Sequence, residues 1–361
     1  MTALLRQLDR VLDRRALARA LLVLAPVLAA ALNGGDPLWM PAALAAASSF
    51  IAMEEAGLAP LGVALHGLAI AAGFLILLTA LPYPPLFALA AAAIAAAAIL
   101  ITAKGHRLRT LGNFVFIPAL YIACELAEIG RTPMLQRGFA FLPHMAFAFV
   151  PVLLLSAVEY VPNREEGIPY LQHLVWLGRR KGDFGRVVPV TEGTAAIIGA
   201  VATAALLVEW CHVAHAQWVV WSAASIVTGD VASARRKLGD RAVGALIGVP
   251  LGLVLALAAP QASWMLRSAA IGGLLTLIIF RIYPIAFGTR CSLITLGLSL
   301  AGEPSGAATR LENVLTGGAI GLAFVLLAHA SANFIGRRLG CAAAIPNSKG
   351  VQPCHRLIFK P

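Results

Sequence analysis

One arginine lies deep within an otherwise apolar stretch of the sequence. Arg290, in Thr289-Arg290-Cys291-Ser292, comes seven residues after Tyr283, which is about 10 Å into a bilayer core at ~1.5 Å per helical residue. Placing a guanidinium group at that depth costs roughly 2.5 to 3.5 kcal/mol on insertion scales. This cost favours a functional role, and a cation at membrane depth is what binding an organic anion requires. The alternative is that the side chain snorkels to the nearer surface.

Two tryptophans are spaced so that they share one face of a short helix. Trp218 and Trp221 lie three residues apart, so their rings could stack on an aromatic molecule while their indole N–H groups donate hydrogen bonds. Anchoring at the membrane interface is the simpler explanation. With Arg290, the pair predicts a binding site for a small aromatic or hydrophobic acid.

Several titratable side chains fall within or near apolar stretches and are candidates for coupling transport to protons. Histidine titrates near neutral pH, and carboxylates at the ends of spans can exchange protons with water. The alternative is that the histidines are satisfied packing residues and that the glutamates are simply solvated. The candidates are His66, His144, His329, Glu125 and Glu128.

No metal, cofactor or enzymatic activity is predicted. The 5 cysteines are scattered and form no Cys-x-x-Cys pair. The densest ligand cluster, Cys211-His212-x-x-His215, is more typical of histidines at a helix end than of a metal site. The sequence has no His-Glu-x-x-His motif, no Gly-x-Ser-x-Gly motif and no P-loop, so known hydrolase and ATPase chemistries are not indicated.

The composition identifies a membrane protein. The chain has 361 residues, of which 60% are hydrophobic and 12% charged, and its mean hydropathy is +0.83. Soluble domains carry about 25% charged residues. The net charge of +11 comes from basic residues between apolar runs, and no basic and aromatic stripe indicates nucleic acid. The lipid bilayer is therefore the predicted environment.

Apolar runs of about 20 residues, the length that crosses a bilayer, predict an all-α integral membrane protein with about twelve transmembrane helices. The candidate spans cover residues 16–32, 37–52, 59–81, 85–102, 111–129, 138–157, 191–209, 216–229, 241–259, 263–280, 283–301 and 311–333.

The basic residues predict the orientation. If both termini are cytoplasmic, most of the 28 Lys and Arg residues fall on the inner side, as the positive-inside rule requires. The prediction is a multi-pass protein of the bacterial inner membrane. A rival interpretation treats Arg14, Arg15 and the first apolar run as a signal peptide.

The two halves share an order of features, which predicts two parallel six-helix repeats. Trp39 and Trp218 begin corresponding short spans, and Pro82 and Pro260 end corresponding glycine-rich helices. The predicted division is an interfacial helix (1–15), a first repeat (16–158), a cytoplasmic linker with an amphipathic helix (159–190), a second repeat (191–335) and a cytoplasmic tail (336–361).

Small residues at four-residue spacing predict close helix packing in the second half. Gly244, Gly248 and Gly252 share one helix face, as do Gly317 and Gly321. Such spacing lets two backbones approach each other. The packing lies either within the bundle or at a dimer or gate interface, so a homo-oligomer is also considered.

The second half resembles the fusaric acid resistance (FUSC) and aromatic acid exporter family. The resemblance rests on Gln217-Trp218-Val219-Val220-Trp221, a basic loop at Arg235-Arg236-Lys237, Arg241-x-x-Gly244-x-x-x-Gly248, and Arg310 seven residues before Gly317. It implies proton-coupled export of small aromatic or hydrophobic acids, often with a periplasmic membrane-fusion adaptor. The chain lacks the large cytosolic domain of the bigger exporters, and Leu61-Gly62 in the first half lacks the arginine.

Two other functions fit the same sequence. Plant malate channels resemble this superfamily and would use the same buried cation, and the scarcity of carboxylates within the spans slightly favours such an organic-anion channel. A non-transporting membrane scaffold would tolerate the loss of Arg290.

Overall fold

Helices account for the regular structure of the chain in a computed structural model that describes residues 10–33, 35–129, 133–160, 177–180 and 190–338. The described part contains no β-strand and has twelve α-helices and two short 3-10 helices, η1 (Ile101–Lys104) and η2 (His106–Leu108). The α-helices are α2 (Arg14–Asn33), α3 (Trp39–Ala56), α4 (Pro60–Ala80), α5 (Pro84–Leu100), α6 (Arg109–Glu128), α7 (Met134–Val158), α9 (Thr191–Trp210), α10 (Gln217–Ile226), α11 (Val231–Ala258), α12 (Ser263–Leu275), α13 (Tyr283–Leu300) and α14 (Ser305–Arg338).

Every predicted span coincides with one of these helices. In the described residues, 8 helices are long and apolar enough to cross a membrane, so the chain is a multi-pass membrane protein. The other four, α3, α10, α12 and α13, do not meet that combined test. Two of them are short: α10 has 10 residues and α12 has 13, which correspond to about 15 Å and ~20 Å. Neither is long enough to cross a membrane core about 30 Å thick.

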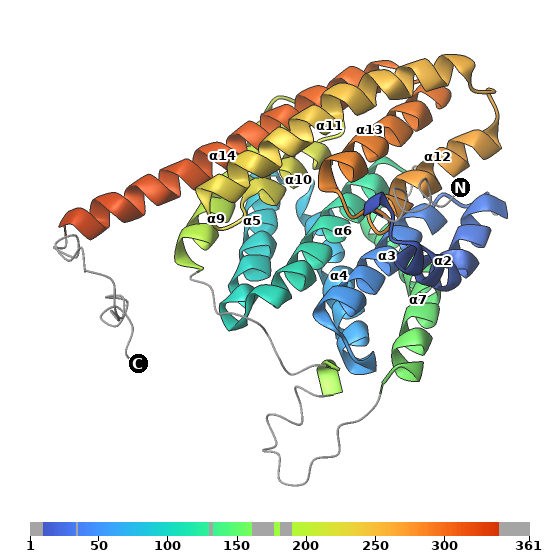
Figure 1. Cartoon of the computed structure of the whole chain (residues 1–361), viewed down its shortest axis with the longest axis horizontal. Coiled ribbons are helices and arrows are strands. Elements are labelled where there is room, and N and C mark those ends of the chain that lie inside the picture. The colour runs from blue at the N-terminus through green and yellow to red at the C-terminus, as the bar shows by residue number, and fades with distance from the viewer. Residues whose placement is uncertain (1–9, 34, 130–132, 161–176, 181–189, 339–361) are drawn as a thin grey trace, which may run out of the picture.

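The long helices of the two halves run in different directions. In Figure 1, α4, α5, α6 and α7 stand side by side, whereas α11, α13 and α14 lie together along the upper edge at a slant to them. The halves touch through α5 and α9, through α6 and α10, and through α2 and α12. Helix α10 packs on α14, α9 and α6, so it lies between the halves.

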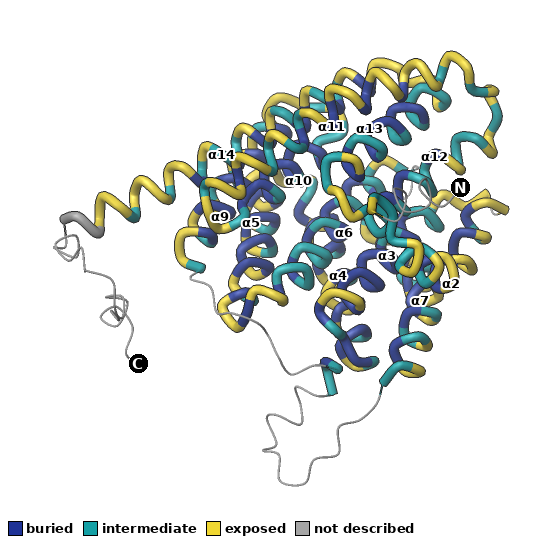
Figure 2. Tube along the Cα trace, in the orientation of Figure 1, coloured by how far each residue is buried: buried dark blue, intermediate teal, exposed yellow. Residues whose placement is uncertain are grey.

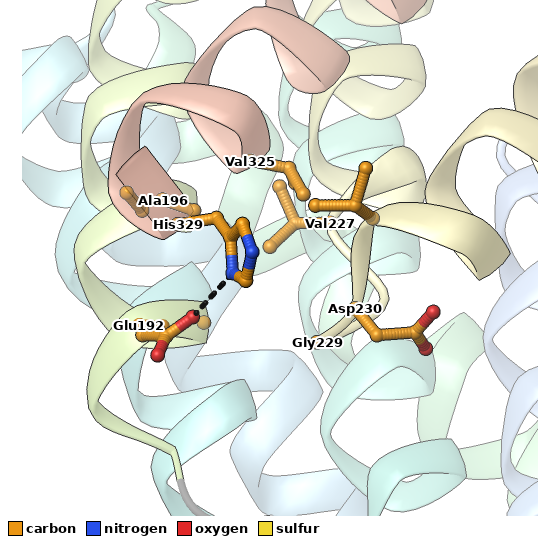
Figure 3. Close-up of a pocket in the computed structure, with 10 residues that line it drawn as sticks. Glu192, Ala196, Val227, Gly229, Asp230, Val325 and His329 are labelled. Atoms are coloured by element: carbon orange, nitrogen blue, oxygen red, sulfur yellow. Dashed lines mark ion pairs between the residues drawn. The ribbon is translucent and has the colours of Figure 1, made fainter. Parts of the chain in front are cut away.

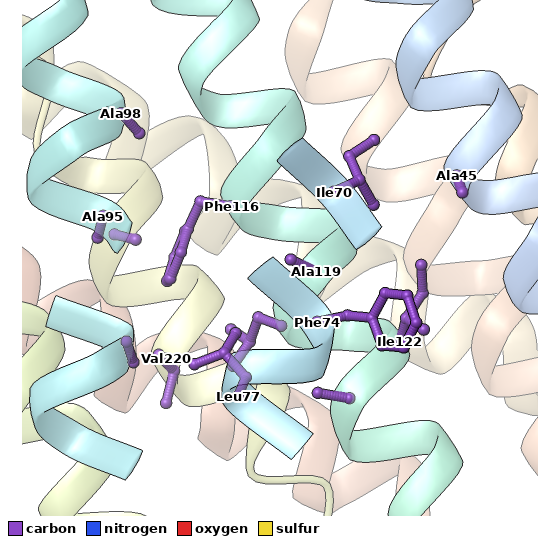
Figure 4. Packing of buried hydrophobic residues seen from close by; sticks show 14 of the residues in the cluster. Ala45, Ile70, Phe74, Leu77, Ala95, Ala98, Phe116, Ala119, Ile122 and Val220 are labelled. Carbon is purple, nitrogen blue, oxygen red and sulfur yellow. The ribbon is translucent and has the colours of Figure 1, made fainter. Parts of the chain in front are cut away.

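Alanine and a few large side chains fill the main core. Figure 2 shows buried residues concentrated on the inward faces of α3, α4, α5 and α6. Figure 4 shows Phe74 of α4 and Phe116 of α6 reaching between helices whose facing residues are small, such as Ala95. A smaller apolar cluster lies between α11, α13 and α14 and includes Ala245, Phe287 and Val314. Outward faces carry exposed leucines and valines, as expected for surfaces that meet lipid.

Ion pairs show which helix ends of the first half lie on the same side of the bundle. At one end, Arg19 of α2 binds Glu54 of α3 at 2.6 Å and Glu159, just after α7, at 2.5 Å. At the opposite end, His144 of α7 binds Asp36, between α2 and α3, at 2.8 Å. Helix α2 therefore runs in the opposite direction to α3 and α7, as a bundle that repeatedly crosses a membrane requires.

The connection between α12 and α13 is held by the segment that precedes α2. Backbone hydrogen bonds join Asp13 to Ile279 (2.7 Å) and Arg281 to Val11 (2.9 Å), and the Arg281 guanidinium lies 3.1 Å from the Asp13 carboxylate. The predicted interfacial helix therefore does not run unbroken to residue 15, because Leu12 forms an isolated bridge with Phe280 and Asp13 is not helical. Most of that prediction, the amphipathic linker helix with Trp176, and the tail from 339 onward lie outside the described residues.

The glycines of the second half pack backbone against backbone, as predicted. A Cβ on Gly248 of α11 would overlap the Gly288 carbonyl of α13, and one on Gly252 would overlap the carbonyl of Ser292. Gly317 and Gly321 of α14 face the carbonyls of Val219 and Ala223 in α10 in the same way. Two tight helix pairs result, α11 with α13 and α10 with α14.

We expect Gly248→Ala to destabilise the protein by about 1–3 kcal/mol, because the added methyl forces α11 away from the α13 backbone. Gly239→Ala is the matched control, since it lies on the same helix and no atom lies within 4 Å of its Cβ position. Thermal unfolding in detergent, followed by fluorescence-detected size exclusion, compares the two variants. Equal midpoints for both would show that the α11–α13 contact is not tight.

Candidate functional site

The end of α12 explains how the structure accommodates Arg290. Helix α12 stops at Leu275, and the backbone N–H groups of the next turn bond to its last carbonyls. The carbonyl that follows, that of Thr276, then needs a donor from elsewhere. Arg290 of α13 donates from Nε to Thr276 Oγ1 (2.8 Å) and from Nη2 to the Thr276 carbonyl (3.2 Å). Part of the guanidinium therefore bonds to the residue that ends α12.

Other arginines make the same kind of contact. Arg109 of α6 donates to the carbonyls of Val227 and Thr228, where α10 ends. Arg137 of α7 donates to carbonyls at the end of α6, including Ala127 at 3.0 Å. Bonding to a helix C-terminus neutralises part of the positive charge, because the helix dipole places partial negative charge there.

Two buried arginines of the second half are not bonded to a carbonyl among the described residues. Arg241 of α11 donates from Nη1 to Ser225 Oγ (2.7 Å) and lies 3.5 Å from the Tyr283 hydroxyl. Arg310 of α14 is only 2% exposed, and its Nε and Nη1 are buried with no hydrogen-bond partner. Arg310 is therefore the least satisfied cation in this part of the described structure.

Both guanidinium groups lie over aromatic rings. The Cζ atom of Arg310 is 4.5 Å from the centre of the Trp218 ring, and that of Arg241 is 4.4 Å from the centre of the Phe287 ring. Such cation–π contacts supply part of the stabilisation that water would otherwise give. They leave the in-plane N–H groups pointing away from the rings, where an anion could accept hydrogen bonds.

One small cavity brings these side chains together. Its lining, which we name the arginine cage, consists of Trp218 and Trp221 of α10, Arg241 of α11, Phe287 and Arg290 of α13, and Arg310 and Val314 of α14. The empty space is about 240 Å³, open solvent included. The site predicted from the sequence, Arg290 with Trp218 and Trp221, therefore lies in a single lining. The sequence points to Arg241 and Arg310 only as features of the family signature, not as members of this site.

The cage carries no acid. None of its lining residues is a carboxylate, and no ion pair involving Arg241, Arg290 or Arg310 occurs among the described residues. Buried charges in proteins are normally paired, because an unpaired one costs several kcal/mol. An anion that enters the cage would supply the missing partner.

The five candidates for proton coupling do not gather at one place. His66 of α4 bonds to Ser49 Oγ at 3.1 Å within the first half. His144 pairs with Asp36. Glu128 is exposed, whereas Glu125 accepts a hydrogen bond from Gln217, the residue before Trp218. Of the five, Glu125 is the one that the structure links to a neighbour of the cage.

His329 lies in a second small cavity at the other end of α14. Figure 3 shows His329 directed at Glu192 of α9, with Nδ1 3.5 Å from Oε2. Asp230 also lines this cavity of about 260 Å³. The pKa of Asp230 is held below its usual value, chiefly by the backbone N–H of Ser233 at the start of α11. Two carboxylates make this cavity unsuitable for an organic acid.

A much larger polar cavity opens at the end of the first half. It encloses about 1730 Å³ with open solvent included, and both arginines and glutamates line it, among them Arg15, Glu55 and Arg107. Glu159 has its pKa lowered, mainly by the hydrogen bond from Arg19. Because these charges pair internally, the cavity resembles a solvated vestibule more than an anion site.

Comparison with known proteins supports the resemblance found in the sequence. Residues 202–324 match the model of a family described as fusaric acid resistance protein-like, which confirms the family prediction over this segment. The segment contains every residue that lines the arginine cage. No curated protein and no solved structure matches the chain.

The two kinds of buried arginine are expected to differ in their effect on stability. Arg290→Met leaves the end of α12 without its donors and should destabilise the protein by about 1–3 kcal/mol. Arg310→Met removes an unpaired buried charge and replaces it with an apolar chain of similar length, so stability should be unchanged or higher. Thermal unfolding of both variants tests this difference. A larger loss for Arg310→Met than for Arg290→Met would assign Arg310 a structural role.

Proposed function

We propose that this membrane protein, whose residues 202–324 match the fusaric acid resistance protein-like family, transports small organic anions across the bilayer. The observation that carries the proposal is the arginine cage, in which three buried arginines meet without a carboxylate. Transport of an anion needs this kind of site, because it replaces the hydration shell that the anion loses.

The aromatic lining favours substrates with an apolar or aromatic body. A carboxylate that accepts hydrogen bonds from Arg310 would place its ring near Trp218 and Trp221, where stacking contributes about 0.5–1.5 kcal/mol beyond area burial. The free volume of the cavity is about 10 Å³, far below the ~300–1,000 Å³ of typical ligand sites. We therefore interpret the structure as a closed conformation that must widen to admit the acid.

The arrangement of helices supports two parallel six-helix repeats. In the proposed correspondence, α2 to α7 match α9 to α14 in order. The contacts of α3 with α7 and of α4 with α6 then recur as α10 with α14 and α11 with α13. The contacts between halves also form a matched pair, since α5 touches α9 and α12 touches α2. The positive-inside rule would place both termini in the cytoplasm of a bacterial cell. The resemblance to the exporter family implies that the acids move outward.

An organic-anion channel is the second candidate. It is favoured by the absence of any carboxylate from the cage lining, because a channel needs no protonatable partner. A transporter of the proton-coupled type would instead lose its driving force when the proton gradient is removed. The two therefore differ in their response to an uncoupler.

Export of radiolabelled benzoate and related acids from loaded cells tests the proposal. Arg310→Met should reduce the export rate by at least about tenfold, since a hydrogen bond to a charged group is worth about 1.5–3 kcal/mol. Arg236→Met is the control, because Arg236 is exposed near the start of α11 and does not line the cage.

The outcomes separate the candidates. Export that stops with an uncoupler and in Arg310→Met supports a proton-coupled transporter. Export that survives the uncoupler but stops in Arg310→Met supports the channel. A native protein that exports no acid of the panel, or export unaffected by Arg310→Met, would contradict the proposed site.

A further inference from the structure

A buried polar contact joins the first half to the edge of the arginine cage. Glu125 lies near the end of α6, and its Oε1 accepts a hydrogen bond from Gln217 Nε2 at 3.1 Å. Gln217 is the first residue of α10 and is 1% exposed. The next residue along α10 is Trp218, whose ring carries the guanidinium of Arg310. Glu125 is therefore linked to the cage through two consecutive residues of α10.

The Gln217 amide is equipped to bind both protonation states of Glu125. Its N–H group donates to the carboxylate, while its own oxygen, Oε1, is buried without a hydrogen-bond partner. A carboxylate cannot use that oxygen, because both groups are acceptors. A protonated Glu125 could donate its O–H to it, so the unpaired acceptor marks a place for one proton.

The charges that face Glu125 come from four helices. On α6 itself lie Tyr121, Cys124 and the exposed Glu128. Glu209 of α9 acts on the same cluster through Cys124, and Arg137 of α7 is bonded to carbonyls at the end of α6.

Arg310 of α14 is the cage cation within reach of this cluster, because its charge acts on Tyr121, which lies beside Glu125. His215, just before α10, stacks on Trp218 at 4.6 Å and lies 3.8 Å from Glu303. Both Glu125 and Arg310 act on Tyr121, so the carboxylate and this cage cation share one neighbour.

We propose that Glu125 and Gln217 form a proton-binding site that makes the arginine cage sensitive to pH without driving transport, such that protonation of Glu125 promotes binding of an anion to Arg310. This inference rests on the proposed function. Its sign follows from electrostatics: a deprotonated Glu125 repels an incoming carboxylate, whereas a protonated one does not. By reciprocity, binding of the anion must promote uptake of a proton by the same factor.

Binding of benzoate to the purified full-length protein in lipid nanodiscs tests the coupling. Benzoate is fully ionised at about pH 6 and about pH 8, so a change in affinity reports the protein. Couplings between sites are typically about 5- to 150-fold, and we expect roughly tenfold tighter binding at the lower pH. A pH dye in weak buffer should record proton uptake when benzoate is added.

Glu125→Gln should bind benzoate tightly at both pH values and take up no proton, because the amide imitates the protonated acid. Glu55→Gln is the control, because Glu55 is an exposed carboxylate of α3 that lines the large polar cavity, and it should keep both the pH dependence and the proton uptake. His215→Gln serves as a second control, since a histidine titrates in this range and would act with the same sign.

The results distinguish this inference from the proposed function. If Glu125→Gln keeps the pH dependence of benzoate affinity that the native protein shows, the role of Glu125 is overturned and the anion site stays intact. The same holds if His215→Gln, and not Glu125→Gln, loses that pH dependence. If the native protein binds benzoate with equal affinity at both pH values, the role of Glu125 is likewise overturned and the anion site stays intact. A native protein that binds no benzoate at either pH overturns the anion site and the coupling together.

Discussion

Backbone carbonyls at helix ends impose the constraint on which the rest of this structure depends. Lipid offers no hydrogen-bond donors, and each unsatisfied polar group costs several kcal/mol. Helices α10 and α12 are too short to cross the membrane, so their carbonyl ends need donors from the protein itself. Arg109 and Arg290 supply them. Arginine suits this task because its guanidinium presents several donors in one plane and keeps its charge when buried.

The same constraint separates Arg241 and Arg310, the arginines of the proposed anion site, from those that cap helices. A guanidinium that caps a helix has a structural reason to be buried, whereas Arg310 has two buried nitrogens without partners and Arg241 bonds to hydroxyl groups only. Glycine contacts hold both in place, since Gly248 fixes α11 on α13 and Gly317 fixes α10 on α14. The cage lies between these two tight pairs, so it can widen by their separation without loss of either glycine contact.

Hydropathy predicted the twelve helices, and four-residue glycine spacing predicted the tight contacts, because both patterns are local. The partner of Arg290 was not predictable. Residues 277–280 are apolar and continue the pattern of a span, yet the chain leaves the helix there, and Ile279 and Arg281 bond to the backbone of the segment before α2. Arg310 was noticed only as part of a motif. Its proximity to Trp218 depends on α14 packing against α10, which no spacing within one helix reveals.

The two halves use the same helix order for different purposes. In the proposed two-repeat arrangement, Trp39 takes the place of Trp218, but its ring packs on His144 and Phe147. Arg137 takes the place of Arg310, but it caps α6. Each unpaired buried cation costs folding free energy, and a chain of marginal stability is not expected to carry several of them in both halves. The first half therefore provides a packed framework, and its contribution to the anion site is the acid that meets α10 at Gln217.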